Sequence, residues 1–230
     1  MDLPKKKWSK DLKLIKPGVE RVLYKGSINL LLDDVPKLAV VGSRRMSDYG
    51  RSVIEKWMPT FIQKGITIVS GFMYGVDQTA HRACLENGGR TIAVLGWGID
   101  RKVAAEDEKL YQQILEVNSL IVSEYEGELE GSVWTFPRRN RIVAGIADAV
   151  LVIEAAEKSG SLITARLARM FGKPLMAVPG LVTSKGAAGT NSLLKTGKAI
   201  MVTSAEEVLT EMGLGEGQIK MKFCDENSKQ

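Results

Sequence analysis

Cysteine and histidine are scarce in this sequence, and their scarcity excludes several kinds of site. The 230 residues include two cysteines, Cys84 and Cys224, and one histidine, His81. One cysteine lies in a helical pattern and the other in a polar tail, a spacing that matches neither a disulfide framework nor a metal site. We therefore expect two free thiols, no metal and no cofactor.

Long apolar runs are absent as well. No run approaches the roughly 20 residues that span a bilayer, and the N-terminal MDLPKKKWSK lacks the apolar centre of a signal peptide. The sequence also has no G-x-x-x-x-G-K-[ST] loop and no G-x-G-x-x-G after its first predicted strand, which argues against nucleotide hydrolysis and dinucleotide-dependent redox chemistry. These absences predict a cytoplasmic protein that does not associate with membranes.

What the sequence does contain is a regular alternation of short apolar runs and helical patterns. The runs predict strands at about 38–41, 66–69, 91–95, 120–122, 149–153, 174–178 and 199–202. Helical patterns follow them at about 48–64, 76–87, 106–117, 137–147, 160–171, 190–196 and 204–212. Strands that alternate with helices form a parallel sheet covered on both faces, so we predict an α/β fold in a single domain, with a doubly wound, mostly parallel sheet.

The remaining segments flank this domain. Residues 1–35 form a basic N-terminal extension, in which YKGSINLLLDD predicts a short hairpin or strand, and 36–212 form the α/β domain. Residues 213–230 form a polar tail without periodicity, which we expect to be disordered. The net charge of +5 favours anionic partners, but the positions of the charges matter more than their sum.

The residues that follow the predicted strands have a common character. In open parallel sheets, ligands bind beyond the carboxyl ends of the strands. The residues at these ends are Gly42-Ser43-Arg44, Ser70-Gly71, Gly96-Trp97-Gly98, Ser123-Glu124-Tyr125, Glu154-Ala155 and Pro179-Gly180. Small residues let a ligand approach the backbone, hydroxyl and N–H groups bind phosphate oxygens, and arginine adds bidentate charge. They predict a phosphate-binding rim, although glycine at a turn is equally well explained by backbone geometry.

The segment WTFPRRNRIVAGIADAVLVIEAAEKSGSLITARLA adds two candidate anion sites. If Pro137 occupies the first position of a helix, Arg138, Arg139 and Arg141 crowd the positive end of its dipole, and a bound anion would relieve the repulsion. Ser159-Gly160-Ser161 opens a second helix, whose free N–H groups could face an anion. The alternatives are a solvated arginine face and ordinary helix caps.

Two further side chains have both a structural and a functional interpretation. Asp77 precedes His81 by four residues, which places the two on one helical face. We favour a structural contact between them over acid–base catalysis, because the sequence offers no second histidine and no persuasive nucleophile. Phe136, directly before Pro137, is the preferred candidate for stacking on a base, with core packing as the alternative.

Four stretches of sequence occur in a fixed order: VVGSRRMSDYG, IVSGFMYGVDQTAHRACLENGGRTIAVLGWGID, FPRRNRIVAGIADAVLVIEAAEKSGSLITARLARMFGKPLMAVPG and GTNSLLKTGKAI. Together they resemble the DNA-processing protein A (DprA, also called Smf) family, over roughly residues 20–205. The resemblance implies a Rossmann-like domain that binds single-stranded DNA without catalysis and helps to load the RecA recombinase onto it, as in natural transformation. It also implies a homodimer.

The rim and the resemblance together define a predicted set of DNA-binding residues. These are Gly42, Ser43, Arg44, Arg45, Ser70, Gly71, Phe136, Arg138, Arg139, Asn140, Arg141, Ser159, Gly160 and Ser161. The resemblance implies that the first three line a pocket, that Ser70 and Gly71 form its floor, that Phe136 and the following polar residues form its wall, and that the Ser-Gly-Ser segment closes it.

The resemblance also has departures and rivals. Many family members add an N-terminal helical domain and a C-terminal winged helix, and we expect neither within these 230 residues. The loop 103–109 is more acidic here than in the family pattern. One rival function is that of the phosphoribohydrolases of the lysine-decarboxylase-like fold, whose P-G-G-x-G-T-x-x-E signature is missing. Another is a module that senses a free mononucleotide in the same rim.

Overall fold

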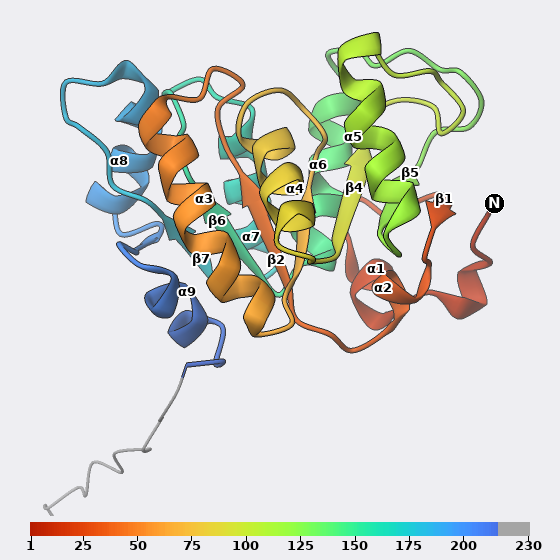
Figure 1. The fold of residues 1–230 in the computed structure, drawn as a ribbon, viewed down its shortest axis with the longest axis horizontal. Helices are drawn as coiled ribbons and strands as arrows, with labels where there is room; N and C mark the ends of the chain where they lie inside the picture. Colours follow the sequence, from red (N-terminus) through yellow and green to blue (C-terminus); the bar gives the residue numbers. More distant parts are fainter. Residues whose placement is uncertain (216–230) are drawn as a thin grey trace, which may run out of the picture.

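One twisted sheet forms the centre of the protein, whose computed structural model describes residues 1–215 (Figure 1). Its strand order is β1-β5-β4-β3-β2-β6-β7-β8, and all neighbours are parallel except β1 and β5. The strands are β1 (Leu23–Gly26), β2 (Lys37–Val41), β3 (Thr67–Ser70), β4 (Thr91–Leu95), β5 (Leu120–Ser123), β6 (Ala149–Val152), β7 (Leu175–Ala177) and β8 (Ile200–Met201). The predicted doubly wound α/β fold, Rossmann-like in form, is therefore confirmed.

Helices cover both faces of the sheet. The α-helices are α1 (Lys10–Leu14), α2 (Asn29–Leu32), α3 (Asp48–Gln63), α4 (Val76–Glu86), α5 (Ala105–Glu116), α6 (Thr135–Ile146), α7 (Ser161–Met170), α8 (Ala188–Lys195) and α9 (Ala205–Glu211), with short 3₁₀ turns at η1 (Lys5–Lys7) and η2 (Lys185–Ala187). In Figure 1, α3, α4 and α5 lie in front of the sheet and α6 and α7 behind it. Helix α9 packs against α3, and α1 packs against α6.

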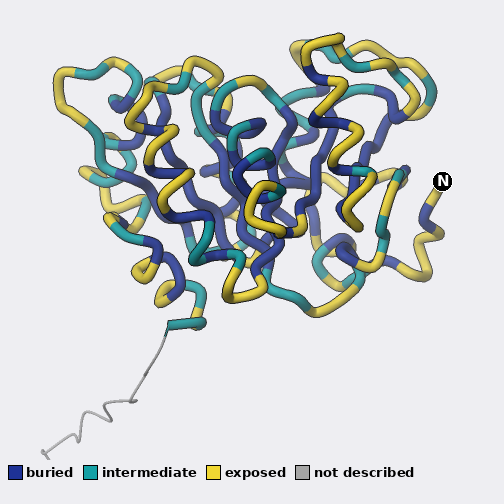
Figure 2. Tube along the Cα trace, viewed as in Figure 1, coloured by how far each residue is buried: buried dark blue, intermediate teal, exposed yellow. Residues whose placement is uncertain are grey.

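The core consists of the sheet and the inward faces of these helices (Figure 2). Every residue of β2 is buried, which explains why its sequence after Lys37 is a continuous apolar run, 38–41, rather than an alternation. Leu38 and Val40 pack into the layer that contains α3 and α4, whereas Ala39 and Val41 pack into the layer that contains α6 and α7. A strand with two covered faces needs apolar side chains in both directions.

The N-terminal residues contribute to the same sheet and core. Strand β1 pairs with β5 at the edge of the sheet, as the predicted short strand suggested. The following NLLL is helical, because α2 buries Leu30 and Leu31, so this part of the predicted hairpin is wrong. Ile15, just after α1, packs so closely on α6 that a Cβ at Gly145 would lie 2.4 Å from its Cγ1.

Three further predictions concern membrane association, the two cysteines and the C-terminal tail. No helix within residues 1–215 is both long and apolar enough to cross a membrane. Cys84 is a free, buried thiol, and burial raises its pKa to about 12. Cys224 and the predicted tail from residue 216 onward lie outside the described residues.

Candidate functional site

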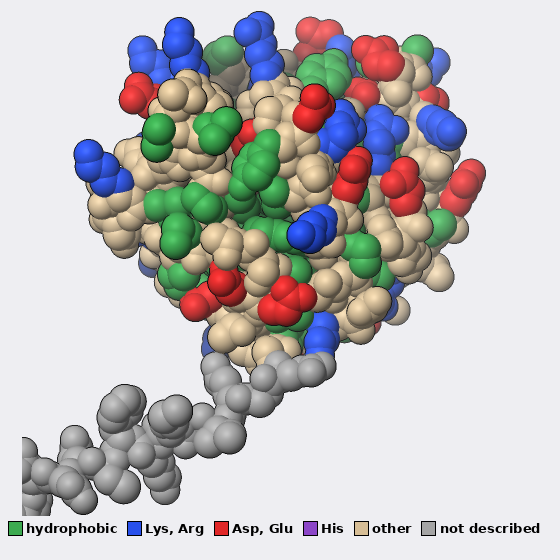
Figure 3. Space-filling model, turned by 60° about the vertical axis from the view of Figure 1, so that its left-hand side comes forward, with side chains coloured by type: hydrophobic (Ala, Val, Ile, Leu, Met, Phe, Trp, Pro, Cys, Tyr) green, Lys and Arg blue, Asp and Glu red, His purple; other side chains and the backbone are tan. Residues whose placement is uncertain are grey.

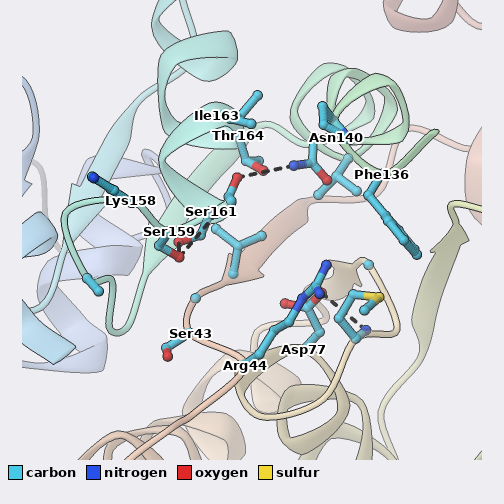
Figure 4. Close-up of a pocket in the computed structure, with 18 of the residues that line it drawn as sticks. Ser43, Arg44, Asp77, Phe136, Asn140, Lys158, Ser159, Ser161, Ile163 and Thr164 are labelled. Carbon is cyan, nitrogen blue, oxygen red and sulfur yellow. Dashed lines mark hydrogen bonds between the residues drawn. The ribbon is translucent and has the colours of Figure 1, made fainter. Parts of the chain in front are cut away.

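The position of the site follows from the order of the strands. The chain runs outward from β2 through β3, β4 and β5, and then returns to place β6 on the other side of β2. Ligands of doubly wound sheets bind at such a reversal, where the loops after the two strands diverge. A pocket of about 990 Å³ lies at this point, between the β2–α3 loop, the β3–α4 loop and the first turns of α6 and α7 (Figure 4).

Most of the residues predicted to bind DNA line this one pocket. They are Gly42, Ser43, Arg44, Arg45, Gly71, Phe136, Arg139, Asn140, Ser159, Gly160 and Ser161. Ser70, Arg138 and Arg141 do not line it. The Ser70 hydroxyl is buried beneath the floor and donates to the Val40 carbonyl at 2.6 Å, so it joins two strands.

The β2–α3 loop places two arginines at the pocket. Arg44 and Arg45 are exposed, and neither forms an ion pair with any residue of the described part of the chain. The Ser43 hydroxyl accepts a hydrogen bond from the Arg45 amide at 3.0 Å, which fixes the turn. Gly75 allows the next loop to approach, because it has a φ of +74° and a Cβ there would lie 2.3 Å from the Ser43 carbonyl oxygen.

Glu154, two residues beyond the end of β6, holds the far end of the same loop. Its buried carboxylate accepts a hydrogen bond from the Ser47 amide at 2.8 Å and contacts the Ser47 hydroxyl at 2.5 Å. Ser47 in turn caps α3 by accepting a hydrogen bond from the Gly50 amide. Both carboxylate oxygens of Glu154 therefore hold the β2–α3 loop in place.

Arg139 and Asp77 form the floor of the pocket. Arg139 is 3% exposed, and its guanidinium donates to the carbonyls of Gly71 and Val94. Burial lowers the pKa of Arg139 to about 10 and raises that of Asp77, and the attraction between the two charges opposes both changes. Gly71 is required between them, since a Cβ there would lie 2.6 Å from each side chain.

Arg138 and Arg141 are committed to carboxylates. Arg141 Nη2 donates to Glu124 Oε1 and Oε2 at 2.7 and 2.9 Å, and both side chains are at most 3% exposed. Arg138 pairs with Glu20 and lies 3.6 Å from Glu124. The pKa of Arg138 is raised by its hydrogen bond to Glu20. Both arginines were predicted to form the pocket wall, and their placement there is wrong.

The start of α6 also differs from the prediction. The helix begins at Thr135, so Pro137 is its third residue rather than its first. The Thr135 hydroxyl accepts from the Ser132 amide at 2.8 Å and donates to the Ser132 carbonyl, which shapes the turn before the helix. Arg138 is thus the fourth residue of the helix. Carboxylates, not a bound anion, balance the charges of Arg138 and Arg141.

The β6–α7 segment closes the pocket on the opposite side. Ser159 Oγ lies 2.8 Å from Ser161 Oγ, and the Asn140 amide donates to the Gly160 carbonyl at 3.3 Å, which ties α6 to the start of α7. The first three N–H groups of α7 already have partners, because the Ser161 amide donates to Ser159 Oγ at 3.4 Å and the Leu162 and Ile163 amides donate to the Ser159 and Gly160 carbonyls at 3.1 Å. The prediction of free N–H groups at this helix start is therefore wrong for these three, and the segment lines the pocket with its two serine side chains.

Phe136 extends toward the pocket floor in Figure 4. The Arg44 guanidinium lies over its ring, 5.4 Å from the centroid, and Trp97 meets the ring edge-on with centroids 6.3 Å apart. The ring therefore supports Arg44 directly, a contact that the predicted base-stacking role did not include.

His81 lies away from this chemistry. Its Nδ1 is 2.6 Å from Thr91 Oγ1, while Asp77 accepts from the Met73 amide, so the predicted Asp77–His81 contact is wrong. The histidine is fully buried, and burial together with nearby arginine charge lowers its pKa to about 3. Within residues 1–215, no group of three or more His, Cys, Asp or Glu side chains is arranged to hold a metal.

Sequence reasoning overlooked several residues that line the pocket. Lys158 and Lys185 are exposed cations on its wall, and Asp77 and Thr164 are buried polar residues beside it. Lys158 directly precedes Ser159, so the strand-end rule could have found it. Lys185 follows β7 after a longer loop, and no local pattern marks it.

Comparisons with known proteins agree with one another. A family model described as DNA recombination-mediator protein A matches residues 2–213. Protein Smf of Escherichia coli (strain K12) is 41% identical over 179 residues, which make up 78% of this chain and 48% of that protein. The chain thus spans about half the length of this curated relative.

Two solved structures have the same fold. DNA processing protein A (DprA) from Streptococcus pneumoniae superposes with a TM-score of 0.84 at 36% identity, covering 92% of this chain and 74% of that one. DNA processing protein A from Helicobacter pylori, whose structure concerns its single-stranded DNA binding mode, gives 0.81 at 30% identity and covers 91% and 94%.

Proposed function

The chain belongs to the DNA recombination-mediator protein A family, and from this premise we propose that it binds single-stranded DNA in the pocket between the β2–α3 loop and α7. The observation that carries the proposal is the charge of the pocket lining. Its exposed cations are Arg44, Arg45, Lys158 and Lys185, whereas its one carboxylate, Asp77, is buried against Arg139. The pocket therefore presents unpaired positive charge to a ligand.

These cations would contact phosphates. Arg44 stacks on Phe136, which holds its planar guanidinium while leaving its N–H groups free for bidentate contacts. The Ser159 and Ser161 hydroxyls supply further hydrogen-bonding groups on the opposite wall. Backbone contacts of this kind bind strands with little regard to sequence. The predicted residues at 42–45, 71, 136, 139–140 and 159–161 are the proposed binding set.

We assign the protein no catalytic step. Its only histidine is buried and bonded to Thr91, and the carboxylates of Asp77 and Glu154 are held by amides, an arginine or a hydroxyl. The proposed role is that of a mediator that loads the RecA recombinase onto the bound strand, as a homodimer. Such a role places the protein in the cytoplasm, where both the DNA and RecA are found.

Titration of labelled oligo(dT), duplex DNA and thymidine monophosphate tests the binding claim. Single strands should bind most tightly, because several phosphates can engage the cations of the pocket at once. If oligo(dT) binds no better than the monophosphate, the site is a mononucleotide sensor and the proposal fails. Release of free base from nucleoside monophosphates would instead reveal a phosphoribohydrolase.

The mediator role needs a separate measurement. RecA filament formation is followed on single strands coated with single-strand-binding protein, with and without this protein. We expect faster filament formation in its presence. An unchanged rate, in a preparation that binds oligo(dT), would restrict the function to DNA binding.

A further inference from the structure

The two ends of the pocket differ in charge. One wall continues from Gly131 into a loop with three exposed carboxylates, Glu126, Glu128 and Glu130, of which the first pairs with Arg21 and the third with Arg101. The opposite wall carries the exposed Lys158 and Lys185. In Figure 3, Lys and Arg side chains stand along the upper edge of the molecule, and Asp and Glu side chains are interspersed with them toward the right. The unpaired cations of the opposite wall therefore attract a polyanion that leaves the pocket, whereas the acidic loop offers it one carboxylate, Glu128, without an ion-pair partner in residues 1–215.

A second hollow lies beyond the positive wall. It has a volume of about 350 Å³ and separates α7 from α8. It is lined by Glu157, Leu162, Ala165, Arg166, Arg169, Gly189, Ser192, Leu193, Thr196 and Lys198. Glu157 and Lys158 are adjacent in the chain, and one lines each hollow, so the two hollows share this loop.

The geometry of α7 explains why both hollows exist. Ser161 and Thr164 face the pocket, whereas Leu162, Arg166 and Arg169 have the helical spacing that places them together on another face. The start of α8 is held against the β6–α7 loop, because the Gly189 amide donates to the Ala155 carbonyl at 2.7 Å.

The second hollow combines a basic rim with an apolar floor. Arg166, Arg169 and Lys198 are exposed and form no ion pair within residues 1–215. The floor contains Leu162, Ala165 and Leu193, so the hollow offers cations to phosphates and apolar surface to sugars and bases. Glu157 is its one carboxylate.

We propose that a single strand leaves the pocket across the Glu157–Lys158 loop and continues along the hollow between α7 and α8, where Arg166, Arg169 and Lys198 bind its phosphates. This inference rests on the proposed function, since it extends the path of the same strand. It assigns the hollow a binding role for long strands only, because a short strand is held within the pocket.

The test compares short and long strands. Affinities for oligo(dT) of about 4 and about 20 nucleotides are measured by fluorescence anisotropy. The Arg166→Gln/Arg169→Gln variant should bind the long strand about 20-fold more weakly at about 0.1 M salt, and its salt slope should fall by about 1.4, or about 0.7 for each lost phosphate contact. Its affinity for the short strand should be unchanged.

Two further variants make the test specific. Lys56→Gln/Lys109→Gln removes the same charge from exposed positions on α3 and α5, and we expect almost no effect. Glu157→Gln should bind the long strand about two- to fivefold more tightly, because one repulsive charge is lost. A folding defect cannot produce that gain.

The outcomes separate this inference from the proposed function. If wild-type protein binds neither strand, the proposed function fails, and the extended path fails with it. If wild-type binds both strands and the Arg166→Gln/Arg169→Gln variant either binds the long strand as wild-type does or loses both equally, the extended path is wrong while the pocket stands.

Discussion

Two groups of arginines near the same pocket differ in whether carboxylates pair with them. Arg44 and Arg45, after β2, are exposed and without acidic partners in the described residues, whereas Arg141 and Arg138, on α6, are paired with carboxylates. Arg139 lies between these cases, since it lines the pocket but gives its hydrogen bonds to backbone carbonyls. A cluster of arginines in the sequence therefore does not by itself indicate a surface that binds anions. The role of each arginine depends on the group with which its guanidinium interacts.

The difference arises from how each group is desolvated. A guanidinium taken out of water must recover its hydrogen bonds from the fold, as Arg141 does from Glu124 and from the carbonyls of Pro17 and Gly18. An exposed guanidinium keeps its water until a ligand displaces it. The α6 group thus serves stability, and the β2–α3 group remains available for binding.

The largest expected effect concerns Arg141. The variant Arg141→Met leaves the Glu124 carboxylate buried without its strongest partner and should lower the free energy of unfolding by about 3–5 kcal/mol. Urea denaturation measures this loss. A matched variant, Arg101→Met, breaks a pair in which Glu130 is 79% exposed and should cost less than about 1 kcal/mol.

A second substitution checks the cause of this loss. Adding Glu124→Gln to Arg141→Met removes the stranded charge and should restore part of the stability. If Arg141→Met costs no more than the Arg101→Met control, the arginine is not a structural residue and the contrast between the two groups fails.

A smaller effect concerns His81, whose buried imidazole has no acidic partner among residues 1–215. Its pKa is about 3 in the folded protein and near 6.5 when unfolded, so only the unfolded state takes up the proton between these values. Stability is therefore lost as the pH falls below about 6.5, at about 1.4 kcal/mol per pH unit. Between pH 7.5 and 5, wild-type should lose about 2 kcal/mol more than His81→Gln in urea denaturation. Equal losses would mean that folding does not lower the pKa of the imidazole.

The smallest effect concerns Arg138, whose partner Glu20 is 73% exposed. Arg138→Met should cost less than about 1 kcal/mol in stability, and its affinity for oligo(dT) should remain within about twofold of wild-type, since it lines neither hollow. A tenfold loss of affinity in the folded variant would return Arg138 to the DNA site.

Much of this arrangement could be predicted from the sequence. Contacts between residues far apart in the chain could not, for a physical reason. Continuous apolar runs defined the strands. The rule that ligands bind at strand ends selected Gly42 to Arg44, and the helix-start pattern selected Ser159 to Ser161, all of which line the pocket. The carboxylates that engage α6 could not be predicted. Glu20 is 118 residues from Arg138, and its proximity depends on how the N-terminal segment packs on α6.

The predicted contact between Asp77 and His81 is wrong for a similar reason. Helical spacing put Asp77 and His81 on one face, but the loop before α4 turns the carboxylate toward Arg139, and β4 offers Thr91 to the imidazole. Local periodicity gives the direction of a side chain relative to its own helix. It does not reveal which strand or loop meets that side chain there.

The salt dependence of oligo(dT) affinity tests most directly whether unpaired cations of the pocket bind the strand. Wild-type is compared with Arg44→Gln/Arg45→Gln and with Arg138→Gln. We expect the slope of log affinity against log salt to fall by about 1.4 in the first variant, for two lost phosphate contacts, and to be unchanged in the second. An unchanged slope in a folded Arg44→Gln/Arg45→Gln protein, or an equal fall in both variants, would show that these cations do not bind the strand.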